Sequence, residues 1–177
     1  MSQESYNRFI NSQRGLISST IRDVLLPAML GKETNGISYW IGKDIAREYP
    51  VASVDDLITL TNQLGFGELS LRKENKNQQL YRLSGPIVSE RLGIDHEKVS
   101  FDLEAGFLAM ETEFQVGAAA EAEIVDRRRA SIDIMVQHDP VDKGDSKAEI
   151  AQFIRLQGTP DEPERDKGKK RKKKRDK

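Results

Sequence analysis

Cysteine is absent from all 177 residues of the chain. Its absence excludes disulfide bonds, thiolate nucleophiles, acylation at cysteine, iron–sulfur clusters and cysteine-ligated zinc. Histidine is almost as scarce, because the whole chain holds only His96 and His138. The two histidines do not show the spacing of paired metal ligands, so we expect surface or capping roles for both. The sequence therefore predicts neither a metal site nor a bound cofactor.

Long apolar runs are also missing. The longest uncharged apolar stretch covers residues 24–30, whereas a helix that crosses a bilayer needs about 20 residues. The first residues show neither the basic region nor the apolar region of a secretory signal. We therefore expect a cytoplasmic protein without a transmembrane segment.

Motifs of enzyme active sites are absent as well. The segment Gly65-Phe66-Gly67 lacks the third glycine of a phosphate-binding loop, and the chain contains no Gly-x-Ser-x-Gly or His-Glu-x-x-His motif. The remaining candidates are acids that could pair for acid–base catalysis or bind a hard cation: Glu104, Glu111, Glu113, Glu121 and Glu123. A solvated face is the preferred interpretation of these acids, except for Glu104, whose apolar neighbours favour partial burial. The sequence predicts no catalytic residue and a protein that is not an enzyme.

The net charge of −1 hides two oppositely charged parts. Residues 167–177 contain nine of the 28 basic residues and one of the 29 acidic residues, which leaves 19 basic and 28 acidic residues in the rest of the chain. We expect the apolar-poor stretch 159–177 to be a disordered polybasic tail. It could bind phosphates of nucleic acid or ribosomes, bind an anionic membrane, or merely solubilise an acidic body. The candidate phosphate contacts are Lys169, Lys170, Arg171, Lys172, Lys173, Lys174 and Arg175.

Periodicity of the apolar residues predicts the order of the elements. Helical spacing is found at residues 16–30, 36–49, 53–64, 84–93 and 101–116, and strand alternation at 67–72, 79–83, 118–124 and 132–136. Pro27 falls inside the first helical pattern and should kink that helix or remove one of its hydrogen bonds. Ser84 is a candidate N-cap of the helix at 84–93. This order predicts an α+β fold: a four-stranded, mostly antiparallel sheet with helices packed on one face. An N-terminal helical part is followed by two β-hairpins separated by helices.

The helix at 101–116 is the expected centre of this fold. Large apolar residues recur on one stripe of the helix, at Leu103, Phe107, Met110 and Phe114. A stripe of small residues lies beside it and includes Gly106. A glycine within a helix costs about 1 kcal/mol relative to alanine, so something is expected to approach Gly106 closely. A ligand, a partner helix and close packing onto the sheet all remain open.

The chain is predicted to divide into four parts. Residues 1–14 form a polar N-terminal segment, and residues 15–138 form a single α+β domain. Residues 139–158 form a linker in which 147–157 is a candidate amphipathic helix, and residues 159–177 form the tail.

Five short segments occur in an order that resembles the YslB family of small bacterial cytoplasmic proteins. They are Val24-Leu25-Leu26-Pro27 with Leu30-Gly31-Lys32, Tyr39-Trp40-Ile41-Gly42-Lys43, Leu64-Gly65-Phe66-Gly67, Leu83-Ser84-Gly85-Pro86 and Leu103-Glu104-Ala105-Gly106-Phe107-Leu108-Ala109. The resemblance covers roughly residues 15–138. It also implies a distant similarity to the fold of vinyl reductase-type proteins and transport-particle (TRAPP) subunits, which bind small or acyl ligands in an apolar pocket and some of which dimerise through helices. The cysteines that those relatives use have no counterpart here.

Two hypotheses for function follow. The first is a non-enzymatic scaffold that binds a small apolar ligand or forms a homodimer, with the pocket or interface built from helices 36–49 and 101–116 against the sheet. Its candidate residues are Tyr39, Trp40, Glu104, Gly106, Phe107 and Met110. The alternative is an adaptor that its polybasic tail recruits, by weak and non-specific contacts, to nucleic acid, ribosomes or an anionic membrane.

Overall fold

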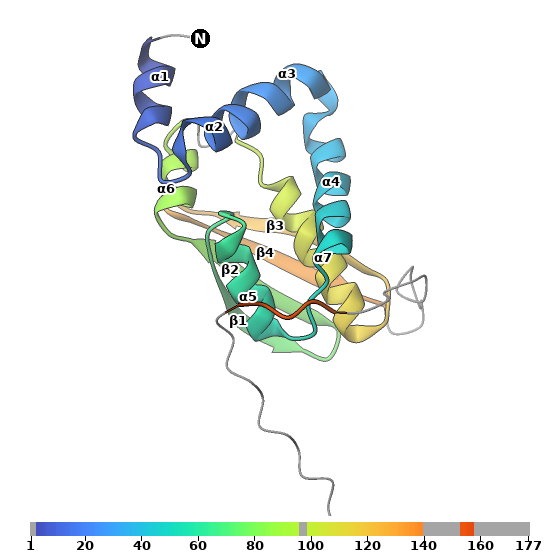
Figure 1. Ribbon diagram of the computed structural model, residues 1–177. Helices are drawn as coiled ribbons and strands as arrows, with labels where there is room; N and C mark the ends of the chain where they lie inside the picture. Colours follow the sequence, from blue (N-terminus) through green and yellow to red (C-terminus); the bar gives the residue numbers. More distant parts are fainter. Residues whose placement is uncertain (1–2, 96–98, 140–152, 158–177) are drawn as a thin grey trace, which may run out of the picture.

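The computed structural model describes residues 3–95, 99–139 and 153–157. It has two layers, a four-stranded sheet and a layer of helices that covers one face of the sheet (Figure 1). The strand order is β1-β2-β4-β3, and every neighbouring pair is antiparallel. The predicted α+β fold is therefore confirmed. The helical elements are α1 (Gln3–Ile10), α2 (Gly15–Thr20), η1 (Ile21–Leu25), α3 (Leu26–Leu30), η2 (Gly31–Glu33), α4 (Thr34–Glu48), α5 (Val54–Gln63), α6 (Pro86–Leu92) and α7 (Asp102–Val116).

Two hairpins build the sheet, as the alternating sequence pattern predicts. β1 (Glu68–Asn75) pairs with β2 (Gln78–Ser84), and β3 (Ala120–Arg127) pairs with β4 (Ser131–His138). The hairpins join where β2 lies beside β4, so that Tyr81 stands opposite Ile134 and Leu83 opposite Ile132. These four side chains are fully or almost fully buried. They form the centre of the sheet face that the helices cover.

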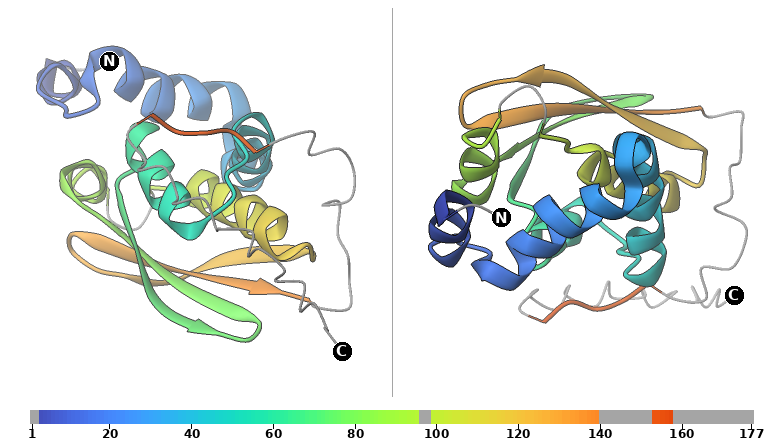
Figure 2. Two further views of the ribbon diagram at one scale, coloured as in Figure 1. Left: turned by 60° about the horizontal axis from the view of Figure 1, so that its bottom comes forward. Right: turned by 90° about the horizontal axis from the view of Figure 1, so that it is seen from above.

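Helix α7 lies between the sheet and α4 (Figure 2). All of its residues from Leu103 to Glu113 are buried. Because α7 is covered on all sides, it has no solvent-facing stripe, and its large apolar, small and acidic residues are all buried in this range. It ends at Gly117, whose φ of 70° is the left-handed conformation that glycine adopts readily.

The close approach predicted at Gly106 is made by α4. A Cβ atom added to Gly106 would overlap the carbonyl oxygen of Tyr39. Across the same interface, a Cβ atom on Gly42 would overlap the carbonyl oxygen of Leu103 and lie 2.8 Å from the backbone nitrogen of Phe107. The two glycines therefore let the backbones of α4 and α7 touch.

The helix predicted at 16–30 is interrupted in a specific way. It forms as α2, a π-helical segment η1 and α3, with Pro27 in the first turn of α3. Pro27 has no N–H to donate to the carbonyl of Asp23 and would clash with it in a regular α-helix. The helix widens instead, and the N–H of Leu26 donates to the carbonyl oxygen of Ile21, five residues earlier.

Two local predictions are corrected. Ser84 is not the N-cap of α6, because Gly85 occupies that position with a φ of 96° and no side chain caps the helix. The candidate helix at 147–157 is wrong in its described part, since residues 153–157 form no helix.

Residues 153–157 form an extended strap beside α5 (Figure 2). The N–H of Ile154 donates to the carbonyl of Pro50 (2.9 Å), and Ile154 and Leu156 pack against the core. In the described part of the predicted helix, the chain is therefore extended and contacts the domain through residues 153–157. His96, the rest of the 147–157 segment and the polybasic tail lie outside the described residues. In the part that is described, no helix has the length and apolarity to cross a bilayer.

Candidate functional site

The N-terminal arm, residues 15–30, turns its two charged side chains inward and exposes several of its large apolar side chains. It comprises α2, η1 and α3 and runs across the top of the helical layer towards α4 (Figure 1). The side chains of Arg22 and Asp23 are only 12% and 9% exposed. The opposite face carries exposed large apolar side chains at a spacing of four residues: Ile17 (76%), Ile21 (47%), Leu25 (46%) and Met29 (71%). This is the reverse of the usual arrangement of a surface helix.

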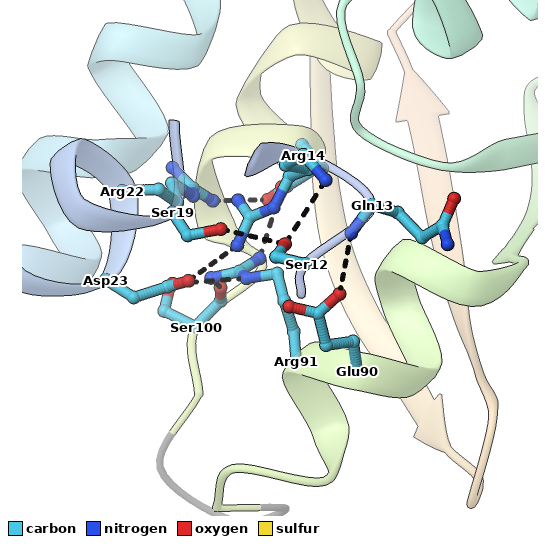
Figure 3. Close-up of polar contacts among 10 residues, drawn as sticks. Ser12, Gln13, Arg14, Ser19, Arg22, Asp23, Glu90, Arg91 and Ser100 are labelled. Atoms are coloured by element: carbon cyan, nitrogen blue, oxygen red, sulfur yellow. Dashed lines mark hydrogen bonds and ion pairs between the residues drawn. The ribbon is translucent and has the colours of Figure 1, made fainter. Parts of the chain in front are cut away.

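The inward charges form a network that we call the arginine cluster. It consists of Arg14, Arg22, Asp23 and Arg91, which are labelled in Figure 3, and of Glu104. Asp23 accepts from Arg14 (2.6 Å) and from Arg91 (3.3 Å). Glu104 accepts from Arg22 (2.7 Å) and from Arg91 (3.3 Å). The network joins the N-terminal arm to α6 and to the first turn of α7, and so fixes the arm to the domain.

Burial controls the electrostatics of the arginine cluster. Each of its five side chains is at most 12% exposed. Burial lowers the pKa of the Arg22 guanidinium, and the neighbouring Glu104 carboxylate opposes that shift. The Nε atom of Arg14 is buried and has no hydrogen-bond partner among the described residues. Among the described residues, the ion pairs of the cluster join three guanidinium groups to the two carboxylates of Asp23 and Glu104.

A cavity of about 310 Å³ lies beside the arginine cluster. Its walls come from the N-terminal arm, the start of α4, the end of α6 and the segment before α7. The lining residues are Arg22, Asp23, Leu26, Pro27, Thr34, Asn35, Ser38, Arg91, Ile94, Asp95, Val99 and Ser100. The cavity therefore combines two guanidinium groups and two carboxylates with hydroxyl, amide and apolar side chains.

A second polar contact joins α4 to the edge strand β3. The hydroxyl of Tyr39 donates to Glu121 and accepts from the N–H of Ala122 (3.0 Å). The buried Lys43 donates to Glu121 (3.0 Å) and to the carbonyl of Ala120 (3.2 Å). Burial and the hydrogen bond with Glu121 raise the pKa of Tyr39. The contact holds two elements together with charged and polar groups.

The structure places the six candidate residues in four different surroundings. Glu104 belongs to the arginine cluster, while Tyr39 and Gly106 touch at the contact between α4 and α7. Phe107 and Met110 are buried, and the ring of Phe107 meets that of Phe66 edge to face at 5.4 Å. Trp40 is 59% exposed at the surface of α4. None of the six lines the 310 Å³ cavity.

The predicted solvated face of acids is wrong for Glu111 and Glu113 of α7, whereas Glu104 is buried, as its apolar neighbours indicated. Glu104, Glu111 and Glu113 are all buried, because α7 lies between α4 and the sheet. Only Glu121 and Glu123, on strand β3, are exposed as expected. Of the buried three, Glu111 is fully buried, and one of its oxygens accepts from the N–H of Val51 (3.1 Å). Burial raises its pKa to about 8, against the smaller effect of that hydrogen bond.

Sequence reasoning missed the partners of Glu104. Arg22 lies 82 positions and Arg91 lies 13 positions from Glu104, and Arg91 lies 68 positions from Asp23. Local periodicity does not connect such distant charges. One signal was present, since Arg22 and Asp23 interrupt the apolar spacing of residues 16–30. That signal does not reveal which face of the helix is buried. Among the described residues, no group of three or more His, Cys, Asp or Glu side chains is placed to hold a metal ion.

Comparison with known proteins confirms the resemblance found in the sequence. Residues 16–137 match the family described as "Protein of unknown function (DUF2507)". The "Uncharacterized protein YslB" of Bacillus subtilis (strain 168) is 35% identical over 124 residues, which are 69% of this chain and 82% of that protein. A crystal structure of a vinyl-4-reductase family protein from Methanocaldococcus jannaschii is similar with a TM-score of 0.50 and 18% identity, over 58% of this chain and 68% of the other. At that identity the likeness concerns the fold alone.

Proposed function

This chain belongs to the DUF2507 family, and we propose that it is a non-enzymatic scaffold that forms a homodimer through its N-terminal arm. One observation carries the proposal: the exposed face of the arm contains no charged residue. The exposed residues between positions 15 and 30 are Ile17, Ser18, Ile21, Leu25, Pro27, Ala28 and Met29.

An uncovered face of this kind is unfavourable in water. Apolar surface contributes about 25 cal/mol for each Å² that is removed from water. The exposed large side chains of the arm are aligned over about 18 Å of helix, given a rise of 1.5 Å per residue, and two further exposed side chains, Ile37 and Trp40, follow on α4. The arm alone presents an apolar area on the order of several hundred Å², while a standard interface buries about 800 Å² per partner. A partner that covers this face would remove most of the apolar area of the arm from water.

A second copy of the chain is the partner that the surface fits best. Four apolar side chains at equal spacing form a ridge that pairs with its own image about a two-fold axis. Helices that lie on membranes carry Lys or Arg beside their apolar face. Here the arm's Arg22 is turned inward and bound to Glu104 (2.7 Å). Neutral, apolar self-pairing therefore matches this surface better than lipid headgroups or nucleic acid.

The non-enzymatic part of the proposal rests on the roles of the buried polar groups. Glu104 joins two arginines, and Lys43 and Tyr39 join α4 to β3. These contacts hold elements of the fold together, as expected of a scaffold.

Sedimentation equilibrium of the full chain tests the dimer. We expect the native protein to be dimeric at about 100 µM, and Ile17→Lys or Met29→Lys to weaken the dimer at least tenfold, about 1.4 kcal/mol or more, because a charge would be buried in the interface. Val125→Lys is the matched control, since Val125 is 43% exposed on β3, away from the arm. A monomeric native protein at that concentration, or equal effects of all three substitutions, would refute the proposal.

A further inference from the structure

Trp40 is a large aromatic side chain that is exposed in the second turn of α4. It is the only tryptophan of the chain, and 59% of it is accessible to water. Since an aromatic side chain buries about 150–250 Å² when it is enclosed, roughly 90–150 Å² of Trp40 still faces water. Ile37, one turn earlier on α4, is also exposed, so the apolar surface extends beyond the N-terminal arm.

The ring of Trp40 is held by two residues of its own helix. The ring of Tyr39 meets it edge to face, with the centroids 6.3 Å apart and the planes at 86°. The Nζ atom of Lys43 lies 5.4 Å from the centroid of the Trp40 ring, a distance at which an ammonium group and an aromatic ring attract each other. These contacts favour one orientation of the ring, although more than half of the residue remains exposed.

Both of these neighbours are themselves fixed to the edge strand β3. Lys43, whose side chain is only 5% exposed, donates to Glu121 (3.0 Å) and to the carbonyl of Ala120 (3.2 Å). The hydroxyl of Tyr39 donates to Glu121 and accepts from the N–H of Ala122 (3.0 Å). Burial of an ammonium group is costly unless the group is paired, and here the pairing keeps it against the tryptophan ring. The support of the ring therefore reaches from α4 to the sheet.

A rigid, exposed tryptophan has the properties of an interface anchor. The binding energy of protein interfaces is concentrated in a few residues, among which tryptophan, tyrosine and arginine are over-represented. A side chain that is ordered before binding loses less conformational entropy when the complex forms.

The area of the apolar surface points to the same residue. The N-terminal arm presents an apolar area on the order of several hundred Å², while a standard interface buries about 800 Å² per partner. The exposed surfaces of Ile37 and Trp40 supply part of the difference. A second copy that covered only the arm would therefore bury less area than a stable dimer needs.

We infer that Trp40 is the anchor residue of the homodimer and that a second copy of the chain buries its ring. Tyr39, Lys43 and Glu121 are positioning residues, which hold the ring in the orientation that the second copy meets. The inference rests on the proposed function, and it extends the interface from the N-terminal arm onto α4.

The single tryptophan makes the test specific, because all tryptophan fluorescence of the full chain comes from Trp40. Emission spectra and acrylamide quenching are measured from about 1 µM to about 100 µM, beside sedimentation equilibrium of the same samples. We expect the dimer to emit at shorter wavelength and to be quenched less than the monomer. Ile17→Lys weakens the dimer, so it should show these changes only at higher concentration than the native protein.

The inference and the proposed function fail in different ways. A native protein that is dimeric by sedimentation, but whose Trp40 is quenched like an exposed side chain, would overturn the inference and leave the dimer standing. A native protein that is monomeric at about 100 µM would overturn both.

Removal of the ring measures its weight in the interface. Trp40→Ala, at the surface of α4, should weaken the dimer by about tenfold or more. Tyr49→Ala removes another exposed aromatic side chain, at the C-terminal end of the same helix, and should leave the dimer unchanged. Equal dissociation constants of the two variants would contradict the anchor role.

The positioning residues are tested by a change of charge without a change of size. Glu121→Gln removes the ion pair with Lys43, so it should weaken the dimer severalfold and increase the rapid motion of the ring in time-resolved fluorescence anisotropy. Glu123→Gln makes the same change two positions later on β3, at an exposed residue that contacts neither Tyr39 nor Lys43 in the described part of the chain, and should alter neither property.

A purely structural role of Glu121 would lower the free energy of unfolding without freeing the ring. Equal motion of the ring in Glu121→Gln and Glu123→Gln would therefore overturn the positioning role.

Discussion

Glu111 is a carboxyl group buried in the middle of α7. It is fully buried, one oxygen accepts from the N–H of Val51 (3.1 Å), and the other has no partner among the described residues. Burial raises its pKa to about 8 from the ordinary 4.5, so the folded protein holds a proton that the unfolded chain loses near pH 4.5. The contribution of this group to stability is complete below about pH 4.5 and is lost as the pH rises through about 8.

Replacement of Glu111 by Gln should therefore flatten the dependence of stability on pH. Between about pH 5 and 8 the native protein should lose up to about 1.4 kcal/mol of unfolding free energy per pH unit through this group. The Glu111→Gln variant cannot ionise there and should be the more stable protein at pH 9. Urea unfolding from pH 5 to pH 9 measures the difference, with Glu123→Gln, at an exposed position of β3, as control. Parallel pH curves for native protein and Glu111→Gln would contradict the buried, protonated carboxyl.

The contact between α4 and α7 depends on two glycines. Gly106 meets the backbone of Tyr39, and Gly42 meets the backbone of Leu103 and Phe107. Since no side chain separates the helices at these points, their distance is set by backbone atoms, and even a methyl group would force them apart.

Replacement of Gly106 by Ala should destabilise the protein by roughly 2 kcal/mol. Overpacking costs about 1–3 kcal/mol, and an overlap with backbone atoms lies at the upper end of that range. The higher helix propensity of alanine offsets about 1 kcal/mol of this cost. Gly36→Ala is the control, because Gly36 lies in α4 with no atom within 4 Å of an added Cβ. That variant should be more stable than the native protein by about 0.5–1 kcal/mol. Chemical unfolding measures both, and equal changes in the two variants would disprove the close contact.

At the scale of the whole molecule, the C-terminal strap closes the helical layer. Residues 153–157 return to the domain beside α5 (Figure 2). Gln63 of α5 donates to the carbonyl of Gln157 (3.3 Å), and the N–H of Ile154 donates to Pro50 (2.9 Å). Because Pro50 precedes Val51, the strap covers the same α4–α5 connection that contacts Glu111.

Truncation of the apolar side chains of the strap should lower the stability of the entire domain. The double substitution Ile154→Ala with Leu156→Ala removes two partly buried side chains, and we expect a loss of about 2 kcal/mol. The double substitution Phe153→Ala with Arg155→Ala alters the exposed positions of the same segment and serves as control. Thermal unfolding of the full chain separates the two outcomes. An unchanged midpoint for the first variant would mean that the strap is not held by these side chains.

Local sequence patterns determined much of this protein. Alternation of apolar and polar residues specified both hairpins, and helical spacing specified α4, α5 and α7. Gly106 indicated a close approach. Each of these signals depends only on residues that are neighbours in the sequence. The order of the short segments indicated the family. The extended strap could not be predicted in this way, since it is held by contacts with Pro50 and Gln63, about a hundred positions earlier.

The tertiary structure alone decided which face of the N-terminal arm is buried. The apolar spacing of residues 16–30 predicts a helix whether that spacing faces the core or a partner. Arg22 lies inside because Glu104, 82 positions away, provides its counter-charge there. The acids of α7 are likewise buried by α4 and the sheet, whose residues are distant from α7 in the sequence. Ion pairs and burial arise from segments that meet only after folding, and no local pattern of residues contains that information.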